Sequence, residues 1–250
     1  MNRALMVEFF KSHRRYTGWV IGFLLAAQIL WSLWPLSRMD QDDLRQGWMF
    51  LFFLFQLLDS LMMPVIVAVV MSRLCDIEHK GQTLRLVNTL MAPGRLFDVK
   101  FIHGSLYMLT ATLLQLLFIF GAGKIKGFSG EPPLAFFVFY FFLTSAVNLT
   151  LVVLQLSLSL LIHNQLVAFS TGLTGAFFGL FSLFFPAEIQ KLAPWGYYGV
   201  LTFIRMDWNP ETRVTRYFST PLDWVGFGLL AAMFIFIYLA GRFLFIRKEQ

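Results

Sequence analysis

The stretch LAFFVFYFFLTSAVNLTLVVLQLSLSLLI, residues 134–162, decides the class of fold. None of its 29 residues is Asp, Glu, Lys or Arg. A bilayer core about 30 Å thick is crossed by roughly 20 apolar residues in a helix, which satisfies its own backbone hydrogen bonds. We therefore predict that this stretch spans a membrane.

The whole chain has the composition of a membrane protein. Of its 250 residues, 58% are apolar and 14% are charged, whereas a soluble domain has about 45–50% and about 25%. It contains 30 Phe and 7 Trp, and its mean hydropathy is +0.67. This is too much apolar surface for one soluble core, and it also argues against disorder, a coiled coil or a nucleic-acid-binding protein. The single Cys75 excludes an intrachain disulfide.

Five further stretches are long and apolar enough to cross the bilayer. The six predicted spans cover residues 16–36, 48–72, 101–123, 134–162, 165–185 and 224–245. The first is longer than the apolar region of a signal peptide and five more follow, so we expect it to be retained as an anchor. We predict an all-α integral membrane protein with six transmembrane helices in a single domain, residues 1–250.

The distribution of basic residues predicts the orientation. Of the 20 Lys and Arg residues, twelve lie in segments on the side of the two termini and eight on the opposite side. The positive-inside rule then places both termini in the cytoplasm. The net charge of +6 reflects this topology and anionic lipid at the inner surface rather than a nucleic acid.

Three segments outside the spans carry predicted structure. Residues 4–15 have apolar and charged faces and predict a helix that lies in the inner membrane interface. Residues 76–90 predict a short cytoplasmic helix, closed by Pro93-Gly94. Residues 186–223 mix aromatic and charged groups, and we expect an extracellular cap whose short helices dip back toward the lipid.

Asp59 lies near the middle of the second predicted span, where an ionised carboxylate costs roughly 2.5–3.5 kcal/mol. Gln56, Ser60 and Met63 share its helix face, and Pro64 favours a kink just beyond them. Two interpretations stay open. This polar face lines a translocation path or a subunit contact, or Asp59 is a protonated or hydrogen-bonded core residue with a structural role.

Small residues recur every fourth position in the first and fifth predicted spans. In the fifth span they include Gly172, Gly175 and Gly179. Such ridges allow helices to approach closely, either within one subunit or between two subunits, and the pattern alone does not distinguish these cases.

Catalytic and metal-binding signatures are absent from the sequence. The four histidines include no pair at ligand spacing. Lys124 follows Gly121-Ala122-Gly123 at the end of the third predicted span, but no Ser or Thr comes after it and no Gly stands five residues before Gly123, so this is not a Walker A motif. We expect no catalytic, cofactor-binding or metal-binding residue in this chain.

The segment DIEHKGQTLRLVNTL, residues 76–90, is followed by Pro93, Arg95 and Lys100. It resembles the E-x-x-x-G-T-L … P-x-x-R … K segment of ABC transporter permeases of the second exporter-type family. One difference is Gln82, which separates Gly81 from Thr83 where many relatives have Gly-Thr directly. The residues Glu8, Lys11 and Arg14 are similar to the amphipathic beginning of the same proteins. Chain length and hydropathy profile are most similar to the lantibiotic-immunity and bacitracin-resistance branch.

This resemblance implies a permease subunit in the bacterial plasma membrane. It would pair with itself or with a sister permease and bind cytoplasmic ATP-binding subunits, which would hold ATP and Mg²⁺. Its cargo would be an amphipathic peptide or antibiotic. The segment at 76–90 would be the coupling helix, and the residues implied in coupling are Glu78, Lys80, Gly81, Gln82, Thr83, Leu84 and Arg85.

Two alternative functions remain open from the sequence. One is an intramembrane enzyme that uses Asp59, His103 and His163. The other is a stand-alone immunity or sensor protein that binds its target without ATP and needs no helix for docking a partner.

Overall fold

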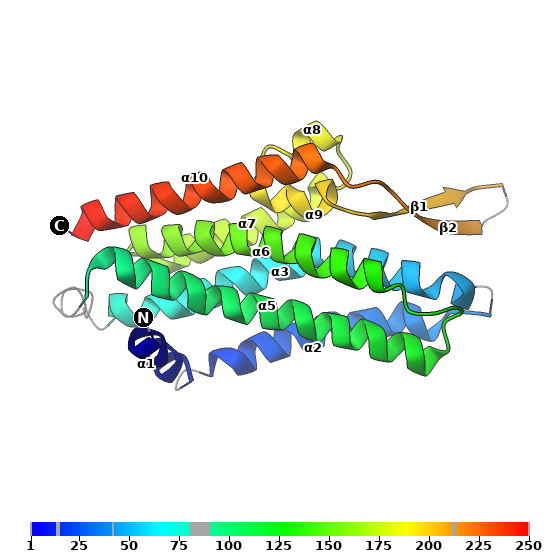
Figure 1. Cartoon of the computed structure of the whole chain (residues 1–250), viewed down its shortest axis with the longest axis horizontal. Coiled ribbons are helices and arrows are strands. Elements are labelled where there is room, and N and C mark those ends of the chain that lie inside the picture. The colour runs from blue at the N-terminus through cyan, green and yellow to red at the C-terminus, as the bar shows by residue number, and fades with distance from the viewer. Residues whose placement is uncertain (1, 14–15, 42, 81–90, 212–213, 250) are drawn as a thin grey trace.

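The computed structural model of the chain describes residues 2–13, 16–41, 43–80, 91–211 and 214–249. Six helices are long and apolar enough to cross a membrane, and they form an elongated bundle (Figure 1). They are α2 (Thr17–Ser37), α3 (Gly47–Lys80), α5 (Pro93–Lys126), α6 (Leu134–Leu161), α7 (Gln165–Ser182) and α10 (Trp224–Glu249). The prediction of an all-α multi-pass membrane protein is confirmed.

Helices α3 and α6 form the centre of the bundle. In each of them 56% of the most apolar window is buried, against 17% in α10, which is covered on one side only. The amphipathic helix α1 (Asn2–His13) and the C-terminus lie at the same end of the bundle, which we call the terminal end (Figure 1). The opposite end carries a β-hairpin and is called the hairpin end.

Helices α3 and α5 are longer than the apolar stretches that predicted them. The second span was expected to end near residue 72 and the third to begin at residue 101, because charged residues bound them there. No proline or glycine interrupts residues 73–80, so α3 continues to Lys80. Helix α5 already begins at Pro93, a favourable first helical position. Residues 76–80 of the predicted coupling helix therefore continue α3, and its residues 81–90 lie outside the described residues.

The segment between α7 and α10 folds into a cap at the hairpin end. It contains α8 (Ala187–Gln190), the 3₁₀ turn η2 (Pro194–Gly196) and α9 (Tyr197–Val200). It also contains the antiparallel strands β1 (Ile204–Asn209) and β2 (Val214–Ser219), which extend past α10 alongside the start of α3 (Figure 1). Tyr217 of β2 packs against Phe50 and Phe53 of α3. The sequence analysis expected the short helices but did not predict this hairpin. A second 3₁₀ turn, η1 (Asp43–Gln46), precedes α3.

The glycine ridge of α7 packs against other parts of the same chain. A side chain at Gly172 would meet Ala68 of α3, and one at Gly175 would meet the ring of Trp195. At Gly179 a Cβ would lie 2.8 Å from the backbone oxygens of both Ser60 and Trp195. These glycines therefore serve close packing within the subunit.

The glycine at position 179 can be tested by adding a single methyl group. We expect Gly179→Ala to lower the free energy of unfolding by about 1–3 kcal/mol, because the methyl group would overlap rigid backbone atoms. Thermal unfolding of the purified protein in detergent measures this loss. Gly121→Ala is the matched control, since no atom lies within 4 Å of a Cβ added at that position. Equal stability of the two variants would contradict the packing described here.

Candidate functional site

Asp59 is the centre of a hydrogen-bonded cluster in the middle of the bundle. Its Oδ1 accepts hydrogen bonds from Gln28 Nε2 at 2.9 Å and from Gln115 Nε2 at 2.8 Å. Its Oδ2 accepts one from the Tyr140 hydroxyl at 2.5 Å. We call Gln28, Asp59, Gln115 and Tyr140 the Asp59 cluster. Each comes from a different helix, so the cluster joins α2, α3, α5 and α6.

The Asp59 cluster supplies what a buried carboxylate needs. All four side chains are at most 1% exposed. An ionised carboxylate only accepts hydrogen bonds, and three donors converge on its two oxygens. Gln115 Nε2 also donates to Gln28 Oε1 at 3.0 Å, and the Tyr140 hydroxyl also lies 3.1 Å from Gln115 Oε1. The partners therefore hold one another in place as well as the carboxylate.

The neighbours of Asp59 on the predicted polar face do not share one open channel. Ser60 and Met63 are fully buried, and the Ser60 hydroxyl donates to the Leu57 carbonyl of its own helix at 2.7 Å. Gln56 accepts a hydrogen bond from the Thr202 hydroxyl, which belongs to the cap. In this conformation the face lies in the packed interior of the subunit.

A second polar link connects the cap to the bundle core. Asn148 Nδ2 donates to Thr112 Oγ1 at 3.1 Å, and the Tyr198 hydroxyl donates to Asn148 Oδ1 at 2.6 Å. Burial and the nearby Asp59 carboxylate raise the pKa of Tyr198 well above its ordinary value. Its hydroxyl therefore stays protonated and remains a donor.

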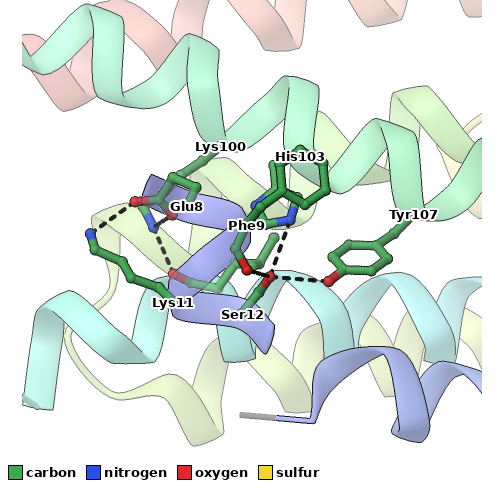
Figure 2. A network of polar contacts seen from close by, with 8 residues as sticks. Glu8, Phe9, Lys11, Ser12, Lys100, His103 and Tyr107 are labelled. Carbon is green, nitrogen blue, oxygen red and sulfur yellow. Dashed lines mark hydrogen bonds and ion pairs between the residues drawn. The ribbon is translucent and has the colours of Figure 1, made fainter. Parts of the chain in front are cut away.

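At the terminal end, a buried ion pair fastens α1 to the bundle (Figure 2). Glu8 Oε2 lies 3.0 Å from Lys100 Nζ, and Glu8 Oε1 lies 2.9 Å from Lys11 Nζ. Lys100 Nζ also donates to the backbone oxygen of Leu74 at 2.7 Å. Glu8 is 3% exposed and Lys100 is fully buried. One ammonium group thus joins α1, α3 and α5.

The electrostatics of Glu8 favour its ionised form. Burial raises the pKa of the Glu8 carboxyl, but the charges and hydrogen bonds of Lys100 and Lys11 lower it more, so the pKa lies below its ordinary value. Glu8 is therefore ionised at neutral pH, and the ion pair with Lys100 is fully formed.

A second set of contacts lies one turn further along α1 (Figure 2). The Ser12 hydroxyl lies 3.3 Å from His103 Nε2 and 3.1 Å from the Tyr107 hydroxyl. The ring of Phe9 lies 4.2 Å from that of His103, which stacks on Tyr107 at 5.0 Å. Together with Glu8, Lys11 and Lys100, these residues form what we call the α1 anchor.

The two helices on either side of the predicted coupling segment, α3 and α5, are hydrogen-bonded to each other, and α5 is also hydrogen-bonded to α10. Lys100 links the start of α5 to the last turns of α3 through the Leu74 carbonyl. Asp98 accepts hydrogen bonds from Arg242 Nε at 2.9 Å and from the Tyr238 hydroxyl at 2.7 Å, which fixes α5 against α10.

The predicted coupling residues themselves fall at or beyond the end of α3. Glu78 and Lys80 belong to the last turn of its backbone, and nothing is described of their side chains. Gly81, Gln82, Thr83, Leu84 and Arg85 lie outside the described residues.

The structure does not bring together the three groups considered for an intramembrane enzyme. His103 contacts α1, whereas Asp59 contacts Gln115, which is twelve residues further along α5. At 1.5 Å per residue this is about 18 Å of helix. His163 lies in the turn between α6 and α7. Within the described ranges, no three His, Cys, Asp or Glu residues are arranged to hold a metal ion.

The sequence did not identify which residues bond to Asp59, although an isolated amide such as Gln115 was expected to bond to a neighbouring helix. Gln28 and Gln115 are isolated amides in apolar helices, a pattern shared by many residues that only bond to a neighbouring helix. Tyr140 stands in a run of aromatic residues, and nothing in that run marks it as a hydrogen-bond donor. The only available signal was the unpaired carboxylate, which required donors from somewhere.

The six long apolar helices first identify the chain as a multi-pass membrane protein. The family described as "ABC-2 family transporter protein" matches residues 4–182, which is 179 of the 250 residues. The chain belongs to this family, so it is a permease subunit of an ABC transporter, which implies association with an ATP-binding subunit. In bacteria such proteins lie in the plasma membrane. No curated protein and no solved structure matches the chain.

The Asp59 cluster predicts a stability defect on changing one atom of the carboxylate. In Asp59→Asn one acceptor oxygen is replaced by an NH₂ group, which would face the amide or hydroxyl donors of its neighbours. Because two donors cannot bond to each other, we expect the free energy of unfolding to fall by about 1–3 kcal/mol. Thermal unfolding in detergent measures this, and membrane insertion should be unchanged. The control is Ser145→Ala, which removes a buried hydroxyl with no hydrogen-bond partner in the described part of the chain. An Asp59→Asn protein as stable as this control would show that the cluster is not needed.

The α1 anchor predicts a defined dependence on pH. Because folding lowers the pKa of Glu8 below the ordinary 4.5, its stabilising effect is complete above that value and is lost as the pH falls through the lowered pKa. Thermal unfolding of wild type and Glu8→Gln should therefore differ most at neutral pH and converge in acid. A difference that stays constant or widens in acid would contradict this assignment.

Proposed function

We propose that this chain is the membrane subunit of an ATP-driven exporter, and that it moves an amphipathic peptide or antibiotic out of the cell as an immunity or resistance protein. Family membership supports the permease role, and the set of contacts around Lys100 is the observation that carries the coupling mechanism. The terminal end of the bundle would face the cytoplasm, in agreement with its excess of basic residues.

ATP hydrolysis is assigned to a separate subunit. The sequence contains no Walker A motif, and ATP with Mg²⁺ would therefore bind to a cytoplasmic partner. That partner would contact the segment from Glu78 to Leu90, between the end of α3 and the start of α5. This is the position where the sequence resembles a coupling helix.

Movement of this segment would reach the middle of the membrane through two helices. Lys100 bonds to α3 and to α1, so a displacement at the terminal end would move the three helices together. The same two helices, α3 and α5, carry Asp59 and Gln115, which bond to each other further along the bundle. Helices α3 and α5 are therefore bonded to each other at two levels, at Lys100 near the terminal end and at Asp59 in the middle of the bundle, and would move as one unit.

A second permease subunit is part of this proposal. Asp59, Ser60 and Met63 are fully buried within one chain, so a path for a bulky amphipathic cargo would form between two subunits. The lipid-facing side of α2 exposes Trp19 and Phe23. Beside them a Cβ added at Gly18 or Gly22 would meet no atom within 4 Å. This surface supports close approach of another helix.

The first test is to purify the tagged chain in mild detergent and to identify bound proteins by mass spectrometry. We expect a stoichiometric ATP-binding subunit whose ATPase activity is stimulated by the permease. Glu78→Ala should reduce that stimulation severalfold while leaving expression intact. Glu188→Ala, on α8 at the hairpin end, is the control and should leave stimulation unchanged.

A chain that purifies alone would overturn the proposal and favour a stand-alone immunity or sensor protein. Normal ATPase stimulation in Glu78→Ala would overturn the assignment of the coupling contact to the segment from Glu78 to Leu90.

A further inference from the structure

A groove with a volume of about 620 Å³ opens at the hairpin end, where the cap meets α3 and the end of α7. Its lining includes Gln56 of α3, Phe184 and Phe185 after α7, Gln190 of α8, and Arg205 of β1. The volume falls in the range of small-molecule binding sites. Neither the Asp59 cluster nor the α1 anchor contributes to it.

Two residues of this lining, Gln56 and Gln190, each have one buried amide atom without a hydrogen-bond partner among the described residues: Gln56 Nε2 and Gln190 Oε1. Both side chains are only 9% exposed. The other end of each amide is already fixed, because Gln56 Oε1 accepts from the Thr202 hydroxyl and Gln190 Nε2 donates to the Phe185 carbonyl at 2.9 Å. One donor and one acceptor are therefore left over, and a buried polar group without a partner is costly.

The free charge of the groove is positive. Asp223 also lines it, but its carboxylate lies 2.5 Å from Lys191 Nζ, and this contact lowers the pKa of Asp223 and raises that of Lys191. Arg205 is exposed on β1, and no carboxylate of the described chain pairs with its guanidinium. An anion therefore complements the groove, whereas a cationic peptide would be repelled.

The rim of the groove is apolar and faces outward. Phe184 is 83% exposed, Phe185 52% and Met206 47%. Exposed apolar side chains grouped at the end of a membrane span form a surface that the hydrocarbon chains of lipids can cover. A small soluble anion would leave this apolar rim unused, so the matching ligand has both an anionic head and a hydrocarbon chain.

We propose that this groove binds an anionic phospholipid of the adjacent membrane leaflet. Arg205 and the Gln56 amide hold the phosphate, since a guanidinium matches phosphate oxygens with paired hydrogen bonds. A head-group hydroxyl, as in phosphatidylglycerol, donates to Gln190 Oε1. The acyl chain lies along Phe184 and Phe185. The site needs neither ATP nor a partner subunit. This proposal therefore goes beyond the proposed function, and its test does not depend on whether the chain is an exporter subunit.

Lipid retention tests the proposal directly. The protein is purified from bilayers of phosphatidylglycerol and phosphatidylcholine in equal amounts, and bound lipid is counted by native mass spectrometry. We expect wild type to retain phosphatidylglycerol over phosphatidylcholine. Arg205→Gln should reduce the retained phosphatidylglycerol about tenfold, as expected for the loss of a charge-assisted hydrogen bond.

Arg216→Gln is the matched control. Arg216 is also exposed on the hairpin, but it pairs in register with Asp207 and does not line the groove. Its replacement should leave retention unchanged. If Arg205→Gln does not fold, Met206→Glu provides a second variant, because its added negative charge should expel an anionic head group.

Three results would overturn the proposal. Equal losses in Arg205→Gln and Arg216→Gln would show general attraction to a charged hairpin. Equal retention of the two lipids would remove the anionic specificity. Displacement of the lipid by inorganic phosphate alone, at matched concentration, would show that the site recognises a free anion and not a lipid.

Discussion

Asp59 places a fully buried carboxylate in the middle of an apolar helix bundle. Asp59 would be costly in lipid unless hydrogen-bond donors reached it. Gln28, Gln115 and Tyr140 supply these donors from three other helices at 2.5–2.9 Å. Because an apolar bundle in lipid lacks a strong hydrophobic drive for association, such polar contacts select how the helices are rotated and aligned. The cluster therefore specifies one packing of α2, α3, α5 and α6.

The α1 anchor, at the terminal end of the bundle, also surrounds a buried charged group with partners from other helices. Lys100 is fully buried; its ammonium group pairs with the Glu8 carboxylate and donates a hydrogen bond to the Leu74 carbonyl. This places an amphipathic helix, which by composition alone would lie free in the interface, against the two helices that flank the predicted coupling segment. Lys100 bonds to the Leu74 carbonyl of α3, and Gln115 of the same helix α5 bonds to Asp59 of α3. In the proposed function, these two contacts would pass a displacement from the terminal end of the bundle to its centre.

The hairpin end has a different chemistry. There the cap is joined to the core by hydrogen bonds from Tyr198 to Asn148 and from Thr202 to Gln56, so its short elements are positioned by the spans below them. The groove between cap and spans combines an exposed guanidinium, unpaired amide atoms and aromatic side chains, an arrangement suited to an amphipathic anion. The two ends thus meet different partners: a protein at the terminal end in the proposed function, and lipid at the hairpin end.

The six spans, the position of Asp59 within the second span and the resemblance to ABC transporter permeases could all be predicted from the sequence. Each of these follows from local properties, because a membrane helix satisfies its backbone within one stretch and a motif is read along the chain. In contrast, three contacts could be recognised only in the folded chain: Tyr140 bonds to Asp59, Lys100 pairs with Glu8, and Gly179 packs on the backbone at Ser60. These pairs lie 81, 92 and 119 positions apart in the chain. Their contacts depend on how each helix is rotated about its axis, which hydropathy does not record.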